Sequence, residues 1–373
     1  MTTQVSVGEL GLPRIVDETG LDTDPRLHPE ELRLAFRNRA LPLEALTYEP
    51  TPTGLHYVLI HYDIPAVDPA TYRLTIGGRV RQPLSLGLAD LQRRPIRGLR
   101  VTLQCAGDGR ALLQPRPVAQ PWLDGAVGTA DWTGTPLRAL LDEAGLEPDA
   151  REIVFTGHDR GIEGDVEQDY QRSLPLDEAL RDEVLLAWAM NGAALEPQHG
   201  FPVRLIVPGW YGMTSVKWLR SMEVIAEPFE GYQNVVAYRY SATRTERGTP
   251  VTLMRVRSLL APPGIPDFLT RVRVVSRGSH EITGRAWSGR LPIVAVQVSA
   301  DGGATWSEAE VDPPTSPFAW QAWRWTWQVV EPGAYELCCR ARDAGGAEQP
   351  VEQAWTARGL GNNAVQRVRV LVT

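Results

Sequence analysis

The sequence predicts an α+β domain over residues 1–245, followed by an all-β domain over residues 246–373. Helical and strand patterns mix through the first two-thirds of the chain, whereas the last third reads almost entirely as short strands. The segment SATRTERGTP, residues 241–250, is polar and apolar-poor, as linkers are. The strand-rich part favours a β-sandwich of the immunoglobulin type.

Local patterns predict the elements of the first domain. TYRLTIGGRV (71–80) alternates apolar and polar residues like a strand that enters a hairpin, and LSLGLADLQRR (85–95) indicates a short amphipathic helix. GTPLRALLDEAGL (134–146) predicts a helix with Thr135 as its N-cap. LPLDEALRDEVLLAWAMNG (174–192) predicts a helix, then a strand, then an Asn-Gly turn.

Hairpins and alternating strands predict the second domain. IVAVQVSADGGATWSEAEV (293–311) indicates a hairpin that turns at Asp301 and Gly302, and QRVRVLV (366–372) indicates a closing strand. Alternation predicts which side chains share one face of their strand: Val294, Val296 and Val298 in the hairpin, and Trp323, Trp325 and Trp327 in WRWTWQV.

Composition excludes several classes of protein. The net charge of -7 argues against a nucleic-acid surface, and no apolar run approaches the ~18 residues of a membrane span. The start, MTTQVSVGELGLPRIVDETG, has no basic or apolar segment of an export signal. Three cysteines cannot make a disulfide framework. A cytoplasmic protein is expected, or a periplasmic one if the chain is a processed form.

Cys105 lies in VTLQCAGDGR, where an alternating strand runs into a glycine-containing turn. A thiolate at a strand end can act as a nucleophile or as a soft metal ligand. The six histidines show no spacing that favours either role, and an inert buried cysteine is a further reading.

A second group of polar residues lies in QHGFPVRLIVPGWYGMTSVKWLRSMEV (198–224). It contains the single lysine among the 38 basic residues of the chain, Lys217. That lysine is either a survivor of a composition biased to arginine or a position that requires a compact ammonium. Glycines, hydroxyls and basic side chains together suit a phosphate-bearing ligand, although no Walker or GxGxxG motif is present.

These two motifs, in this order, resemble the sulfite oxidase family of molybdopterin oxidoreductases. FRNR (36–39) and FTGHDRG (155–161) resemble further segments of the family's molybdopterin-binding domain, and QAWTARGLGNNAVQRVRV resembles its C-terminal dimerisation domain. The resemblance extends from about residue 30 to the end of the chain.

The resemblance implies a role for each matching residue. Cys105 would be the metal ligand to molybdenum. The cofactor-binding residues would be Arg37, Asn38, Asp159, His199, Arg204, Ser215 and Lys217. The catalytic residues around the substrate would be Arg37, Arg110, Trp122, Tyr238 and Arg358, with Tyr240 as the fallback for Tyr238. Three guanidinium groups around one small site suit a doubly charged oxyanion.

The sequence also departs from the family pattern. Asp108 and Gly109 stand where the family often has an asparagine and an arginine. A carboxylate there would either repel sulfite or pair with a nearby arginine. Arg39 replaces a histidine of animal members, and His56 and His61 follow closely. Each of these histidines either replaces a pterin contact or is an ordinary core or surface residue.

The resemblance therefore implies an enzyme that oxidises sulfite to sulfate by oxygen-atom transfer. It would be a homodimer without haem, and an external acceptor such as a cytochrome or oxygen would take the electrons. No nucleic-acid or membrane partner is expected. One alternative keeps the molybdenum cofactor but reduces nitrate or an S- or N-oxide. A more distant alternative is a cofactor-free binding or scaffold protein.

Overall fold

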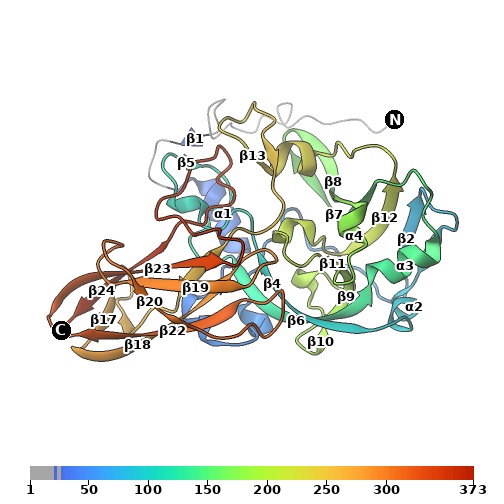
Figure 1. Cartoon of the computed structure of the whole chain (residues 1–373). Coiled ribbons are helices and arrows are strands. Elements are labelled where there is room, and N and C mark those ends of the chain that lie inside the picture. Colours follow the sequence, from blue (N-terminus) through green and yellow to red (C-terminus); the bar gives the residue numbers. More distant parts are fainter. Residues whose placement is uncertain (1–20, 23–26) are drawn as a thin grey trace.

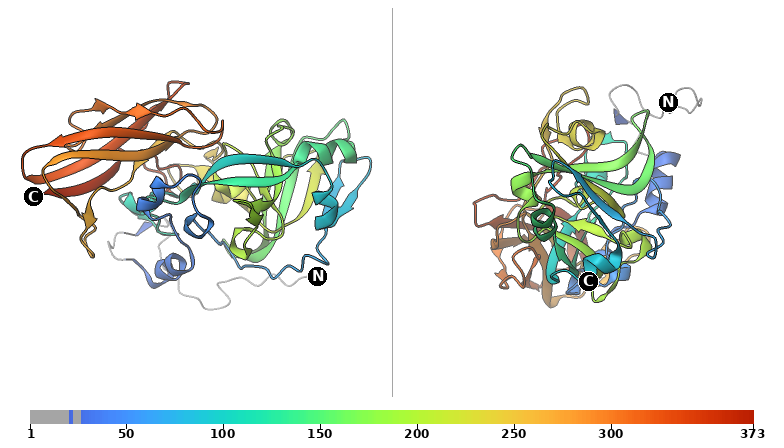
Figure 2. Two further views of the ribbon diagram at one scale, coloured as in Figure 1. Left: turned by 90° about the horizontal axis from the view of Figure 1, so that it is seen from below. Right: turned by 90° about the vertical axis from the view of Figure 1, so that its right-hand side faces the viewer.

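The computed structural model describes residues 21–22 and 27–373 of the chain. Two strand-rich parts lie end to end, and the second part is drawn in orange and red (Figures 1 and 2). The segment 1–20, which carries the expectation about an export signal, lies outside the described residues. No helix in the described part of the chain is long and apolar enough to cross a membrane.

Two five-stranded sheets form most of the first part. The expected strand at 71–80 is confirmed as β2 (Leu74–Gly78), and the strand expected within 174–192 is confirmed as β9 (Leu185–Met190). The expected Asn-Gly turn follows it at Asn191 and Gly192. One sheet contains β4 (Arg97–Gln104), β6 (Val127–Pro136), β9 (Leu185–Met190), β10 (Ala193–Ala194) and β11 (Arg204–Ile206). The other contains β2 (Leu74–Gly78), β3 (Leu84–Leu86), β7 (Glu152–Glu163), β8 (Val166–Pro175) and β12 (Leu219–Ile225). Shorter strands are β1 (Leu21–Asp22), β5 (Arg116–Pro117), β13 (Arg239–Tyr240) and β14 (Thr249–Pro250).

The α-helices of the first part are short, so this part is mostly strand. Two helix boundaries differ from the expectation. Residues 84–86 form a strand before the helix expected at 85–95, and Thr135 belongs to β6, so it is not an N-cap. The helix after it extends from Leu137 to Ala144, within the expected range 134–146. The helices are α1 (Pro29–Arg37), α2 (Leu88–Gln92), α3 (Leu137–Ala144) and α4 (Leu176–Ala179).

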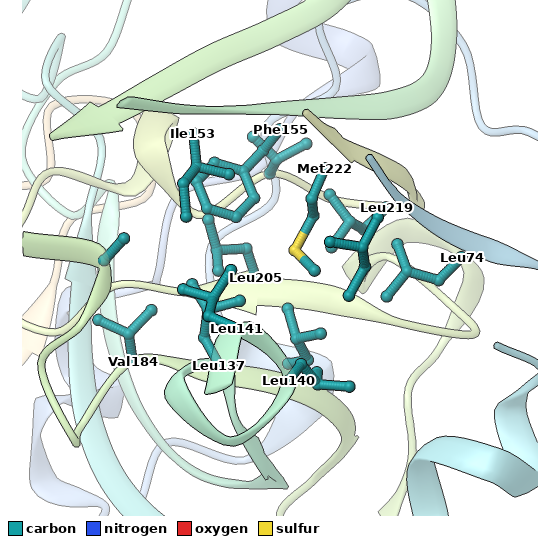
Figure 3. Packing of buried hydrophobic residues seen from close by; sticks show 14 of the residues in the cluster. Leu74, Leu137, Leu140, Leu141, Ile153, Phe155, Val184, Leu205, Leu219 and Met222 are labelled. Atoms are coloured by element: carbon teal, nitrogen blue, oxygen red, sulfur yellow. The ribbon is translucent and has the colours of Figure 1, made fainter. Parts of the chain in front are cut away.

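The core of the first part lies between α3 and the sheet that contains β2, β12 and β7 (Figure 3). Leu137, Leu140 and Leu141 share one face of α3 because residues three and four apart lie on one side of a helix. They pack in the same cluster as Phe155 of β7 and Met222 of β12. This packing fixes β7 and β12, which flank the functional groups described below.

The second part consists of two antiparallel-rich sheets with a shared apolar core. The hairpin at 293–311 and the closing strand are confirmed. The immunoglobulin-type topology stays a prediction. One sheet contains β15 (Arg257–Leu260), β18 (Gly278–Trp287), β21 (Glu310–Val311) and β22 (Gln321–Val329). The other contains β16 (Ile265–Pro266), β17 (Arg273–Val275), β19 (Ile293–Ser299), β20 (Ser307–Glu308), β23 (Gly333–Asp343) and β24 (Gln366–Val372).

The prediction that Val294 shares a face with Val296 and Val298 is wrong. Val294 is 54% exposed, whereas Val296 and Val298 are buried. The register of β19 shifts between Ile293 and Ala295, so the alternation changes face there and Ile293 is buried instead. Of the tryptophan stripe, Trp323 and Trp327 are fully buried and Trp325 is partly buried.

Buried polar contacts join the two parts. Arg257 of β15 is 1% exposed and pairs with two carboxylates of the first part, Asp108 at 3.1 Å and Asp124. The indole nitrogen of Trp287 donates to Oε1 of Gln104 at 3.0 Å. Because unpaired charges are costly to bury, these contacts hold the end of β4 against the second part.

Replacing Arg257 with Leu should lower the free energy of unfolding by about 3–5 kcal/mol, because two buried carboxylates lose their partner. Urea unfolding followed by tryptophan fluorescence measures this loss. The control is Arg324→Leu, whose ion pairs with Glu310 and Asp312 are exposed and are worth at most about 1 kcal/mol. Equal losses in the two variants would contradict the role given to Arg257.

Candidate active site

Cys105 lies immediately after β4, at the start of a tight turn. Its backbone N–H donates to the carbonyl of Ala126 at 2.8 Å, and its own carbonyl accepts from the N–H of Asp108 at 3.1 Å. The side chain is 6% exposed. Burial raises the pKa of the thiol, and the nearby guanidinium of Arg110 opposes that rise. The thiol is thus buried at a strand end, as its sequence position suggested.

Two cavities meet at Cys105. The inner cavity, of about 60 Å³, is lined by Asp159, His199, Arg204, Ser215 and Lys217 among others. The outer cavity, of about 490 Å³, is lined by Arg110, Trp122, Arg244 and Arg358 among others. Cys105, Leu59, His61 and Tyr238 line both cavities. The sequence-predicted cofactor and substrate residues therefore separate largely into two chambers with the thiol between them.

The inner cavity concentrates positive charge. Arg204, at the start of β11, donates to the carbonyls of His199 at 3.0 Å and Ser215 at 3.1 Å, and its guanidinium lies 4.9 Å from the ring of Trp132. Burial lowers the pKa of Arg204 to about 10. Burial, together with neighbouring positive groups, lowers the pKa of His199 to about 3, so this imidazole is neutral.

Lys217 is buried in the same cavity. Its ammonium donates to the carbonyls of Leu59 at 2.7 Å and Gln198 at 3.0 Å and lies 4.2 Å from the ring of Trp218. Burial and the charge of Arg204 lower the pKa of Lys217 to about 7. Burial raises the pKa of Asp159 to about 7, and Lys217 opposes that rise. Both groups therefore titrate near neutral pH.

The outer cavity brings together four of the five residues expected to bind substrate, Arg110, Trp122, Tyr238 and Arg358. The Nε of Arg110 donates to the carbonyl of Arg358 at 2.9 Å, which joins the first part to the second. Trp122 packs in a cluster with Cys105. Arg244, from the segment between the two parts, lines the same cavity. Burial and the charges of Arg358 and Arg110 lower the pKa of Arg244. Three arginines therefore line one chamber.

Tyr238, and not Tyr240, lies at the cavities. Its hydroxyl is 2.7 Å from Nε2 of His61. Tyr240 instead packs against Arg255, whose guanidinium lies 4.3 Å from its ring. Tyr238 follows a π-helical turn over Gln233–Ala237, and such turns often occur at functional sites.

Asp108 and Gly109 do not line either cavity. Oδ2 of Asp108 accepts from Gln104 at 3.0 Å and pairs with Arg257, and Oδ1 accepts from the N–H of Ala126 at 2.9 Å. Of the two readings of this carboxylate, the structure supports pairing with an arginine. Gly109 has φ of +80°, and a Cβ there would lie 2.8 Å from Nδ2 of Asn362, so glycine is required.

Only one of the two expected site residues in the FRNR segment lies at a cavity. Asn38 is buried at the outer cavity, where its amide donates to Gln120 at 2.8 Å and its oxygen accepts from the N–H of Ile60 at 2.7 Å. Arg37 lines neither cavity. It donates to the carbonyl of Tyr62 at 2.5 Å and lies 3.6 Å from Asp63. The structure therefore does not bring Arg37 to the outer cavity, where the other expected catalytic residues lie.

Sequence reasoning missed several residues that line the cavities, and it left the roles of His56 and His61 undecided. His56 lines the inner cavity and His61 lines both, and burial lowers the pKa of each to about 4. Arg244 and Glu163 line the outer cavity without any motif around them. Only the folded path of the linker and of the β7–β8 hairpin brings them there.

The lining of the inner cavity fits an anionic, hydrogen-bonding cofactor. Nε2 of His199, Nε of Arg204 and Oδ1 of Asp159 are buried without a hydrogen-bond partner, whereas buried polar atoms are normally paired. Arg204 and Lys217 supply positive charge for a phosphate, and Cys105 supplies a soft ligand for a metal. A pterin is larger than a cavity of about 60 Å³, so the lining side chains shift when it binds. The fit therefore rests on the positive charges, the unpaired polar atoms and the thiol, and not on the volume.

Comparisons with known proteins agree with this geometry. Residues 61–233 match the oxidoreductase molybdopterin binding domain, and residues 250–373 match the Mo-co oxidoreductase dimerisation domain. Mitochondrial sulfite oxidase of Mus musculus is 36% identical over 371 residues, covering 94% of this chain and 67% of the relative. Sulfite oxidase of Gallus gallus is 35% identical over 372 residues, covering 92% and 78%.

More distant relatives include other activities. Nitrate reductase [NADH] of Ulva prolifera is 30% identical over 345 residues, covering 86% of this chain and 40% of the relative. The crystal structure of the sulfane dehydrogenase SoxCD from Paracoccus pantotrophus matches with a TM-score of 0.76 and 26% identity, covering 95% of this chain and 92% of that chain. The chain is a molybdopterin-dependent oxidoreductase, and it belongs to the sulfite oxidase family.

The single lysine allows a direct test of the inner cavity. In cofactor-free protein labelled with [6-¹³C]lysine, the one side-chain signal should titrate with a pKa of about 7, far below the ordinary value of 10.5. Loading the cofactor should raise this pKa, because a phosphate favours the charged ammonium. A pKa near 10.5 without cofactor would contradict the burial of Lys217.

Proposed function

We propose that this enzyme oxidises sulfite to sulfate, with Cys105 as the metal ligand and the inner cavity as the molybdopterin site. One observation carries the proposal: the thiol separates a chamber suited to an anionic cofactor from a chamber with three guanidinium groups. The chemistry supplied by the bound cofactor is oxygen-atom transfer to sulfur and uptake of two electrons.

The protein residues bind and orient the substrate. Arg110, Arg244 and Arg358 hold the oxyanion by charge-assisted hydrogen bonds and offset its charge. The hydroxyl of Tyr238, fixed by His61, hydrogen-bonds an oxygen of the anion. Trp122, next to Cys105, forms an apolar wall. His199, Arg204, Ser215, Lys217 and Asp159 hold the pterin and its phosphate. Asn38 fixes the backbone at Ile60, between the cavity residues Leu59 and His61.

Further expectations belong to the same proposal. The second part is a sandwich of immunoglobulin type and forms the interface of a homodimer. The match of residues 250–373 to a dimerisation domain supports this role. An external acceptor takes the electrons, and the expected compartment is the cytoplasm. Reduction of nitrate is the second candidate, because nitrate reductases are among the relatives. Three guanidinium groups around one chamber favour a doubly charged anion over nitrate.

Molybdenum-loaded protein should reduce ferricyanide when sulfite is added, and Cys105→Ser should abolish that reduction, because a hydroxyl is a poor substitute for a soft thiolate ligand. Steady-state absorbance measures the rate, and metal analysis of both proteins controls for loading. A loaded wild-type protein that is inert to sulfite but oxidises a reduced dye with nitrate would support the reductase instead.

Arg244→Gln should raise KM for sulfite by roughly 10- to 100-fold, because hydrogen bonds to charged groups are worth about 1.5–3 kcal/mol. Arg247→Gln, at an exposed position in the same linker, is the matched control. Arg37→Gln tests the expectation drawn from the resemblance. If Arg37→Gln raises KM and Arg244→Gln does not, the third guanidinium of the pocket is Arg37.

A further inference from the structure

Glu163 is a carboxylate in a chamber that is otherwise positive. It ends β7 and lines the outer cavity together with Arg110, Arg244 and Arg358. Its Oε2 accepts from the amide of Gln233 at 2.8 Å and from the hydroxyl of Tyr62 at 3.2 Å. These two donors hold the carboxylate on the cavity wall. Among the described residues, the nearby carboxylates Glu167 and Asp169 pair with Arg160 and Arg220, whereas no ion pair includes Glu163.

This carboxylate is unsuited to a chamber built for sulfite alone. Its negative charge lies within electrostatic reach of Arg110 and Tyr238, and so acts on any ligand bound between them. A dianion is disfavoured by such a group, whereas a ligand with a positive end gains an ion pair. Glu163 therefore indicates a substrate that carries both an anionic head and a cationic group.

The size and lining of the chamber agree with a ligand larger than sulfite. The outer cavity of about 490 Å³ falls in the range of roughly 300–1,000 Å³ of pockets that bury organic ligands. Beside the charged groups, its wall contains the apolar side chains of Leu34, Ile60, Val118 and Ile162. These side chains can cover a short carbon chain between the two charged ends of a ligand.

We infer that the enzyme also accepts aminoalkane sulfinates, with the sulfinate held by the three arginines and the ammonium paired with Glu163. The inference rests on the proposed function, because a sulfinate sulfur carries the same kind of lone pair as sulfite. The reaction is R–SO₂⁻ + H₂O → R–SO₃⁻ + 2 H⁺ + 2 e⁻. One S–O bond forms, sulfur is oxidised, and the electrons leave through the molybdenum cofactor to an external one-electron acceptor.

Two sulfinates that differ only in the ammonium group test the inference. The molybdenum-loaded enzyme is assayed with ferricyanide on 2-aminoethanesulfinate, ethanesulfinate and sulfite. We expect kcat/KM for 2-aminoethanesulfinate to exceed that for ethanesulfinate by at least about tenfold. In Glu163→Gln this ratio should fall to about one, while kcat/KM for sulfite should rise, because the carboxylate that disfavours a dianion is gone. Gln keeps the acceptor for Gln233 and Tyr62, so the fold is preserved.

The matched control is Glu167→Gln on the same hairpin, where the carboxylate is exposed, pairs with Arg160 and lies outside the cavity. A second readout does not need turnover: calorimetric binding of 2-aminoethanesulfonate and of ethanesulfonate. The ammonium compound should bind more tightly to the wild type and to Glu167→Gln, and the two should bind alike to Glu163→Gln.

Each other outcome contradicts either the inference about sulfinates, the role of Glu163 or the proposed function. Oxidation of sulfite without oxidation of either sulfinate overturns the inference and leaves the proposed function intact. A preference for the ammonium compound that persists in Glu163→Gln shows that another group recognises it. If sulfite is also inert, the proposed function fails, and calorimetry without a preference for the ammonium sulfonate overturns the role of Glu163 as well.

Discussion

The buried ion cluster of Arg257, Asp108 and Asp124 determines where the thiol lies. Asp108 is three residues after Cys105 in the same turn, and both of its oxygens are engaged, one by Arg257 and Gln104 and the other by the N–H of Ala126. A carboxylate with so many partners in the interior allows little movement. The turn after β4 therefore keeps its shape only while the second part supplies Arg257, so the position of the Cys105 thiol depends on contacts between the two parts.

The two chambers differ in how their charges are balanced. In the inner cavity Arg204 donates only to carbonyls, and its pKa is lowered by burial. Such a group costs free energy until an anion arrives. A ligand that offsets this cost binds the folded protein and not the unfolded chain, so it adds to stability. The outer cavity instead combines guanidinium groups with one carboxylate, which suits a ligand that exchanges at every turnover.

The sequence predicted the inner cavity better than the outer one. His199, Arg204, Ser215 and Lys217 lie within one strand-turn-strand segment, so local sequence is enough to bring them together. Arg244 reaches the outer cavity from a linker that reads as ordinary polar chain, and Glu163 from a hairpin. Arg37 lies in a recognisable motif, but its guanidinium donates to the carbonyl of Tyr62 outside the cavity. Long-range packing determines where Arg37, Arg244 and Glu163 lie, and a local sequence pattern does not contain it. The register shift in β19 likewise determines which face of the strand Val294 takes.

The outer cavity is part of the interface between the two parts. Arg110 comes from the turn after β4, Arg244 from the linker, and Arg358 from the second part. Gly359, with φ of +60°, lets that loop approach Arg110, since a Cβ there would lie 2.5 Å from its Cγ. Like charges of three guanidinium groups repel one another, so the interface must supply enough favourable packing to hold them together. The buried contacts of Arg257 and Trp287 on the same interface provide it. Stability of the domain interface and affinity for an anion are therefore coupled in this protein, because the same contacts that join the parts also hold the arginines in one chamber.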